Sequence, residues 1–349
     1  MEGSLFLFLP FRWFEPELPS SGVKLPLVTI CFPTIGRIEY LSAALRSLGD
    51  QTYPAYEVLV LDNASGPAAQ AILAKFAAET SGVRILRVDE RLPMFANFNR
   101  GIRAAAGEYI VFFHDDDKYE PTFLEKHVAM LRSNRRAAFA GGNFDVIDGE
   151  GLVVNRKRFI KKTETWSGRY FIKRLVRRGR GDLPTPGLVF RRDAMQPSGF
   201  DESLSIHWGD FTILMRMAER WDVAVIADTL FSWRAHGENA STMAFSRSIP
   251  LRTRVLVDYC AEYTERHPDD RLFFQRLRRF VARGHNQGLA WGWLVASDTT
   301  EAKSCRMLLK ASHPSVATLL RILEMLGLTT ERRRLLAPAI RYIAELLGA

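Results

Sequence analysis

Residues 109–121 read YIVFFHDDDKYEP. The first five are apolar, aromatic or β-branched, which is typical of a strand buried on both faces. Three consecutive carboxylates, Asp115, Asp116 and Asp117, follow directly. Like charges this close raise one another's pKa, so the cluster is costly unless another group compensates it. A divalent cation would relieve the repulsion, and a solvated loop or a helix cap is the alternative interpretation.

Short apolar runs alternate with segments of helical periodicity on the N-terminal side of this stretch. The pattern predicts strands at 27–33, 56–63, 83–89 and 107–115. It predicts helices between them at 38–51, 67–80 and 94–106. Such alternation is typical of an α/β fold with a mostly parallel sheet covered by helices on both faces.

Polar residues follow three of these predicted strands, as Pro33-Thr34, Asp62-Asn63 and the acidic triplet. In open α/β sheets, ligands bind beyond the carboxyl ends of the strands, so we expect these groups to meet at one site. The sequence has no GxxxxGK[ST] loop and no GxGxxG after its first strand. These absences argue against a P-loop enzyme and against a dinucleotide cofactor.

The rest of the chain is predicted to change from mixed structure to helices. Before residue 245 we expect a strand at 137–147, a helix at 167–178, a loop and strand at 184–195, a helix at 207–222 and a strand region at 223–236. After it we expect helices at 250–266, 271–296, 301–311, 315–326 and 330–347. The predicted organisation is an N-terminal extension (1–24), an α/β domain (25–245) and an all-helical C-terminal subdomain (246–349).

Positive charge is concentrated in one segment. Residues 154–182 contain eleven Lys or Arg and two acidic residues, an excess that equals the net charge of +9 of the whole chain. Aromatic residues interleave with these cations, as they do in helices at membrane interfaces. Residues 156–180 therefore predict peripheral contact with an anionic membrane or acceptor, and a solvated face is the alternative.

The remaining composition indicates a folded protein in a reducing compartment. Its three cysteines are widely spaced, which predicts neither a disulfide framework nor a zinc cluster. The apolar run at 5–9 is too short for a signal core, and no stretch approaches the roughly 18 apolar residues of a membrane span. We expect a cytoplasmic protein, with peripheral contact to the inner face of the membrane.

Five ordered segments resemble family 2 glycosyltransferases of the GT-A fold, the nucleotide-diphospho-sugar transferase fold. They are PLVTICFPTIGRIEYLSAALRSLGDQTYPAYEVLVLDNAS, MFANFNRGIRAAAGEYIVFFHDDDKYEPTFLE, GLVFRRDAM with GFDE, GDFTILMRMAER and WRAHGENAS. The resemblance runs from about residue 26 to residue 243. It implies an inverting transferase that moves a sugar from a nucleotide sugar to an acceptor hydroxyl, for instance in polysaccharide biosynthesis.

The resemblance also implies a role for each matching residue. Asp210 would be the general base, and Asp62 would accept a hydrogen bond from the base of a UDP or dTDP donor. The metal ligands, for Mg²⁺ or Mn²⁺, would be Asp116, Asp117 and His236. The other donor contacts would be Pro33, Thr34, Glu39, Asn97, Asn99 and Asp115, of which Asp115 pairs with Asp116 as the DxD-type motif.

Two residues depart from the family pattern, and three other functions stay open. Gly209 stands where the family has a glutamate before the base, and His114 stands where many members have an acidic residue. The alternatives are a nucleic-acid-binding protein built on the basic segment, a nucleotidyltransferase on a related sheet, and a transferase fold without catalysis. The first would leave the strand-end carboxylates without a purpose, so we expect no nucleic acid. The acceptor, a glycan or lipid-linked saccharide, is not visible in the sequence.

Overall fold

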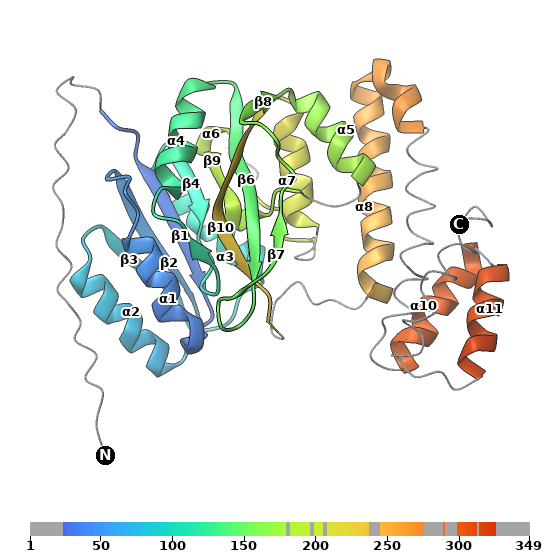
Figure 1. Cartoon of the computed structure of the whole chain (residues 1–349), viewed down its shortest axis with the longest axis horizontal. Helices are drawn as coiled ribbons and strands as arrows, with labels where there is room; N and C mark the ends of the chain where they lie inside the picture. The colour runs from blue at the N-terminus through green and yellow to red at the C-terminus, as the bar shows by residue number, and fades with distance from the viewer. Residues whose placement is uncertain are drawn as a thin grey trace.

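A computed structural model describes residues 24–178, 182–195, 199–204, 208–236, 245–275, 289, 299–312 and 314–325 (Figure 1). Its strands are β1 (Val28–Thr34), β2 (Tyr56–Asn63), β3 (Val83–Val88), β4 (Tyr109–Phe112), β5 (Lys118–Tyr119), β6 (Ala137–Ile147), β7 (Val153–Lys157), β8 (Glu164–Trp166), β9 (Leu188–Arg191) and β10 (Asp222–Arg234). Its helices are α1 (Ile38–Gly49), α2 (Pro67–Glu79), α3 (Met94–Ala104), α4 (Phe123–Ser133), α5 (Gly168–Arg178), α6 (Arg192–Met195), α7 (Gly209–Ala218), α8 (Phe245–Arg266), α10 (Thr299–Ser312) and α11 (Pro314–Met325), with short 3-10 turns η1 (Thr185–Gly187) and η2 (Pro268–Asp270).

One mixed sheet forms the centre of the molecule. Its strands follow the order β3-β2-β1-β4-β9-β6-β10-β5, while β7 pairs with β6 and β8 pairs with β10. The long strands β3, β2, β1, β4, β6 and β10 point the same way, because β9 is antiparallel to both β4 and β6. The carboxyl ends of these parallel strands therefore meet at one edge of the sheet, as predicted.

Alternation along the strands divides the core into two layers. Ile30 and Phe32 of β1 pack in the layer that contains the buried faces of α1, α2 and α4. Cys31, between them, packs in the other layer with α3, α5 and α7. Helix α1 presents apolar residues at Leu41, Ala44, Leu45 and Leu48, the spacing of a single helix face. The prediction of a sheet covered on both faces is confirmed.

The sequence did not predict β5, α4, β7 and β8, and the short helix α6 lies at the end of the stretch 184–195, for which a loop and strand were predicted. The strands β5 and β8 have only two and three residues, and β7 reads VVNRK, which lacks the apolar alternation of a half-buried strand. In the C-terminal part, α8, α10 and α11 match three predicted helices, and α10 and α11 pack together on the side of α8 away from the sheet (Figure 1). Three predicted segments lie wholly or mostly outside the described residues. They are the N-terminal extension 1–24, of which residue 24 is described, the helix 330–347 and most of the helix 271–296.

Three cations of the basic segment, all on α5, take part in holding the fold together. Asp270 in η2 accepts two hydrogen bonds from Arg169 of α5, at 2.8 and 2.6 Å, and it also contacts Lys173. Arg174 pairs with Asp182 at 2.9 Å. The bonds to Asp270 tie α5 to the turn that follows α8, and three of the five cations of α5 are paired within the protein.

We predict that Asp270→Asn lowers the free energy of unfolding by about 1–3 kcal/mol, the usual range for hydrogen bonds to charged groups. The bonds from Arg169 hold the pKa of Asp270 down at about 2. A depressed pKa stabilises the fold above the unfolded value near 4, and this contribution is lost as pH falls toward 2. Denaturant unfolding at pH 7 and pH 2.5 checks this, because the difference between mutant and wild type should shrink at the lower pH. Asp269→Asn, an exposed neighbour, is the control; equal effects of both changes would contradict the prediction.

Candidate active site

A pocket of about 570 Å³ opens at the carboxyl ends of β1 and β4. Six of the residues predicted for the site line it: Pro33, Thr34, Asn97, Asp115, Asp116 and Asp210. They come from β1, α3, the turn after β4 and the first turn of α7. Segments nearly two hundred residues apart in sequence therefore meet around one cavity, at the sheet edge that the strand pattern indicated.

Asp115 is held by the loop that follows β1. The Thr34 hydroxyl donates to its carboxylate at 2.6 Å, and Arg37 donates at 3.1 Å. Gly36, with a φ of 86°, makes the turn that precedes Arg37, in a conformation that side chains disfavour. Burial and the neighbouring Asp116 nevertheless raise the pKa of Asp115, because these two effects exceed the opposing hydrogen bonds.

The other two carboxylates face different partners. Asp116 lies 3.1 Å from Nε2 of His236 and 3.5 Å from Arg37. Asp117 is buried and accepts the backbone N–H of Arg234 at 2.9 Å. Burial, followed by the charge of Asp116, raises the pKa of Asp117 well above its usual value. The cluster thus combines three acidic groups with little compensating charge.

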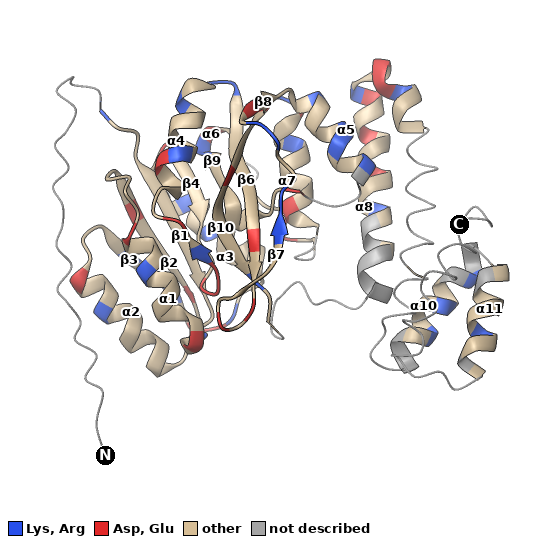
Figure 2. Cartoon of the chain, in the orientation of Figure 1, with Lys and Arg blue, Asp and Glu red and all other residues tan. Residues whose placement is uncertain are grey.

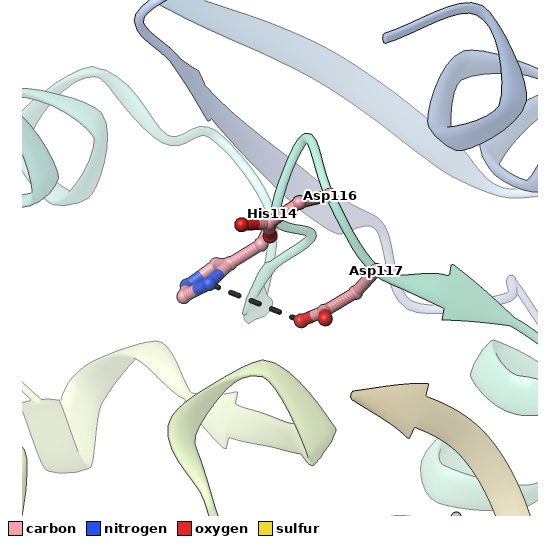
Figure 3. Close-up of side chains that lie close together, drawn as sticks. All are labelled: His114, Asp116 and Asp117. Atoms are coloured by element: carbon pink, nitrogen blue, oxygen red, sulfur yellow. Dashed lines mark ion pairs between the residues drawn. The ribbon is translucent and has the colours of Figure 1, made fainter. Parts of the chain in front are cut away.

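His114, Asp116 and Asp117 form a group that can hold a cation. One ligand atom from each lies within 4.8 Å of the others, and the His114 ring points toward the Asp117 carboxylate at 3.9 Å (Figure 3). Nε2 of His114 and Oδ2 of Asp117 have no hydrogen-bond partner among the described residues. Desolvation lowers the pKa of His114, which favours the neutral imidazole that binds metals. A divalent cation fits this donor set.

The predicted metal ligand His236 lies beside this group but is not one of the three. Its ring contacts Asp116 and packs on the ring of Tyr40, with centroids 5.1 Å apart. His114 entered the sequence prediction only as a departure from the family pattern. Its position directly after a buried strand and before the triplet was a usable signal that the prediction did not use.

Asp210 lies on another wall of the same pocket. Its carboxylate accepts the N–H of Phe211 at 2.8 Å and the hydroxyl of Thr185 at 3.3 Å. Desolvation dominates over these bonds and raises the pKa of Asp210 to about 6. A carboxylate with a pKa near the operating pH can accept a proton and still be ionised.

Phe95 explains why residue 209 is a glycine. A Cβ built on Gly209 would lie 2.0 Å from the Phe95 ring, which is stacked on Phe200 with centroids 4.9 Å apart. The phenylalanine therefore occupies the space that a side chain at 209 would need. Phe95 also lines the pocket, so an aromatic wall stands where the family pattern has a glutamate.

Three of the other predicted donor contacts, Asp62, Glu39 and Asn99, make internal contacts or face solvent, and Asn97 makes an internal bond although it lines the pocket. Asp62 is buried, does not line the pocket, and accepts bonds from the Ser65 N–H and from Arg87, both at 2.9 Å. Glu39 is exposed in the first turn of α1. The Asn99 amide is bonded to the backbone of Phe200, and its neighbour Asn97 donates to the carbonyl of Leu61 at 3.2 Å.

Sequence reasoning missed several residues of the pocket wall. They are Arg37, Arg91, Phe95, Phe98, Lys157, Thr185 and Trp233. Arg37 follows a predicted strand end closely, which was a usable signal. Lys157 and Trp233 reach the pocket through the pairing of distant strands, which local patterns do not reveal.

Comparison with known proteins agrees with this geometry. The sequence profile described as glycosyl transferase family 2 matches residues 29–197. The chain belongs to this family. The family 2 chain is 23% identical over 131 residues to "Putative teichuronic acid biosynthesis glycosyltransferase TuaG" of Bacillus subtilis, an alignment that covers 38% of the chain and 52% of TuaG. It thus spans about half the length of this relative.

Two solved structures share the fold. The family 2 chain superposes on Staphylococcus aureus TarS 1–349 in complex with UDP-GlcNAc with a TM-score of 0.55, 14% identity and coverage of 90% and 91% of the two chains. It superposes on the mannosyltransferase PcManGT of Pyrobaculum calidifontis, in complex with GDP-Man and Mn²⁺, with a TM-score of 0.54, 16% identity and coverage of 93% and 87%. The predicted GT-A fold is confirmed. Among the described helices, none combines the length and the apolar character that crossing a bilayer requires.

We predict that Gly209→Glu damages both stability and the pocket, because the added side chain would displace the Phe95 ring. Overpacking of this kind costs about 1–3 kcal/mol of unfolding free energy. Thermal unfolding and tryptophan fluorescence, which reports on Trp208 next to the site, check it. The double variant Gly209→Glu with Phe95→Ala should recover part of the loss. A stable single variant would show that Phe95 does not determine this position.

Proposed function

We propose that the chain is an inverting, metal-dependent glycosyltransferase that uses a nucleotide sugar, with UDP or dTDP as the nucleotide. The observation that supports this most directly is the placement of two kinds of carboxylate around one pocket. The group His114, Asp116 and Asp117 is suited to a cation, and Asp210 approaches from another element with a raised pKa. A metal-dependent inverting displacement uses both parts, with the base kept apart from the cation.

The donor is proposed to lie along the ends of β1, β2 and β4. Pro33 and Thr34 border this part of the pocket, and Asn63 and Arg91 extend it toward β3. The internal bonds of Asp62 make it a support for the adjacent loop in this structure. Contact between Asp62 and a uracil or thymine base stays a prediction, and so do the donor roles of Glu39 and Asn99. TarS in complex with UDP-GlcNAc supports a donor of this class.

Asp116 and Asp117, with His114, would hold Mg²⁺ or Mn²⁺, and His236 would orient Asp116 through their 3.1 Å contact. When bound, the cation neutralises charge on the diphosphate leaving group. Thr34 and Arg37 keep the neighbouring Asp115 carboxylate fixed at the pocket wall. PcManGT was solved with Mn²⁺, which supports a divalent ion in this fold.

Asp210 would remove the proton of the acceptor hydroxyl as its oxygen attacks the anomeric carbon. Thr185 and the Phe211 N–H orient the carboxylate, while its partly buried setting keeps it basic enough to accept a proton. Phe95 packs against Gly209, next to this base, and excludes water from that side. The chain's own groups thereby position the base and its substrate before the reaction.

The acceptor is proposed to be a hydroxyl of a glycan or a lipid-linked saccharide. The protein is proposed to be cytoplasmic, with peripheral membrane contact. The division into an α/β domain at 25–245 and a helical subdomain at 246–349 is part of the proposal. Helix α8 places Leu256, Tyr259 and Tyr263 in the core layer of α5 and α7. We therefore expect the subdomain to stabilise the transferase domain.

For the cation, we expect Asp116→Asn to weaken Mn²⁺ binding and to lower hydrolysis of UDP-glucose by at least tenfold. Titration calorimetry measures the first effect independently of turnover. His114→Asp should shift preference from Mn²⁺ toward Mg²⁺, because an imidazole ligand favours the softer ion. Asp50→Asn, on the surface at the end of α1, serves as the control. Unchanged Mn²⁺ affinity in Asp116→Asn would remove this residue from the metal site.

For the base, Asp210→Asn should retain UDP binding and lose transfer by about 10²–10⁴, the usual contribution of a general base. In the wild type, kcat should rise with pH through about 6, because only the ionised carboxylate accepts a proton. The exposed first-turn acid of α6 provides the matched control Asp193→Asn. Loss of UDP binding in Asp210→Asn would assign this residue to the donor site instead.

A further inference from the structure

The basic segment contains two parts with different surroundings. On α5, Arg169, Lys173 and Arg174 are engaged with Asp270 and Asp182. Residues 152–162, which we call the β7 strip, run along β7 and into the loop that leads to β8. Figure 2 shows the cations of this part on β7 and on that loop.

The β7 strip combines exposed aliphatic side chains with unneutralised cations. Leu152, Val153 and Val154 are 64%, 46% and 59% exposed. The strip contains no acidic residue. Four of its five cations have no ion pair among the described residues: Arg156, Lys157, Lys161 and Lys162.

The fifth cation, Arg158, is paired with an acid of the neighbouring strand. Asp145 of β6 lies opposite Arg156 in the strand pairing, but its carboxylate is bonded to Arg158 at 2.6 Å. The charge of the other four cations is therefore directed to solvent or to a ligand. On an edge strand that faces only solvent, charged residues alone would prevent pairing with the edge of another molecule. Three adjacent exposed aliphatic residues are unusual in such a strand and indicate a binding surface.

The strip is joined to the pocket in two ways. Lys157 lines the pocket wall and pairs in register with Phe144, which lines it too. The turn that leads into the strip is held by Arg234, whose guanidinium donates to the carbonyls of Asp148 and Gly149 at 2.8 and 2.9 Å. The same guanidinium donates to the carbonyl of Asp116 at 2.8 Å.

We propose that the β7 strip is the docking surface for an anionic lipid bilayer and brings the mouth of the pocket to the membrane surface. Leu152, Val153 and Val154 would enter the interfacial layer, and the cations would contact lipid phosphates. The exposed aliphatic residues favour lipid over nucleic acid as the partner. A surface that binds nucleic acid needs cations and aromatic rings for stacking, and it does not need aliphatic side chains. The proposal rests on the proposed function in one respect: it places a lipid-borne acceptor at the transferase pocket.

Co-sedimentation of the full chain with vesicles tests the surface. The probes are vesicles of phosphatidylcholine alone and of phosphatidylcholine mixed with phosphatidylglycerol. We expect binding to the anionic vesicles that weakens with salt. Each cation near an anionic surface changes the partition by about fivefold, so the combined Arg156→Ala, Lys161→Ala and Lys162→Ala variant should bind about a hundredfold more weakly. The double variant Leu152→Asn with Val154→Asn should lower binding several-fold. Its binding should depend on salt more strongly than that of the triple variant, because the cations remain.

Two matched controls separate this surface from general effects. Arg135→Ala removes an exposed cation after α4, and Ile85→Asn changes an exposed aliphatic residue on the other edge strand, β3. Both should bind vesicles like the wild type. Circular dichroism confirms folding of each variant, and UDP binding in solution should be unchanged in all of them, since none of the substituted residues lines the pocket.

The outcomes distinguish the two proposals. Absence of UDP-sugar hydrolysis and UDP binding in the wild type would overturn the proposed function, whatever the vesicles show. Vesicle binding that the triple variant retains, or that Arg135→Ala loses equally, would overturn the docking surface alone. Salt-dependent binding of single-stranded DNA or RNA by the wild type, without binding to anionic vesicles, would assign the strip to nucleic acid and also overturn it.

Discussion

The site depends on contacts that stabilise three adjacent, mutually repelling carboxylates in a buried turn. Arg37 reaches Asp115 and Asp116 from the loop after β1, and the backbone of Arg234 binds Asp117 from the end of β10. These two arginines are separated by almost two hundred residues, and both act at the carboxyl edge of the sheet. Both contacts stabilise the acidic turn, which carries charges that repel one another. They form because the parallel strand order brings the ends of β1 and β10 to the same edge of the sheet. A bound cation would supply the compensation that remains.

The sequence predicted the parts of the fold that follow from local periodicity. Strands such as Tyr56–Asn63 and Ala137–Ile147 were bounded correctly, because long apolar runs between turns leave little ambiguity. The short or polar strands were not predicted, since β7 is stabilised by its pairing with β6 and not by its own pattern. The reversed direction of β9 is likewise a property of the assembled sheet.

The structure brings some of the predicted site residues to the pocket and places others in internal contacts. Thr34, Asp115 and Asp116 line the pocket at strand ends, where the strand pattern placed polar groups, whereas the site role of Asp210 followed only from the family resemblance. The amide of Asn99 instead fixes Phe200, a contact across about a hundred residues that no local pattern encodes. Gly209 is a second residue that the sequence alone does not explain. A glycine is needed there because the Phe95 ring fills the adjacent space, and a single sequence does not show that these two residues are neighbours.

Arg234 has a consequence for how the molecule can move. Its side chain bonds at once to the backbone of Asp116 and to the β6–β7 turn, and it packs over the Tyr40 ring at 4.9 Å. A shift of the turn must therefore be transmitted to the acidic cluster, or these bonds must break. If a ligand at the acidic cluster and a partner at the β6–β7 turn bias this connection differently, thermodynamic linkage requires each to change the affinity of the other by the same factor. A single buried guanidinium thus connects the acidic cluster to the β6–β7 turn.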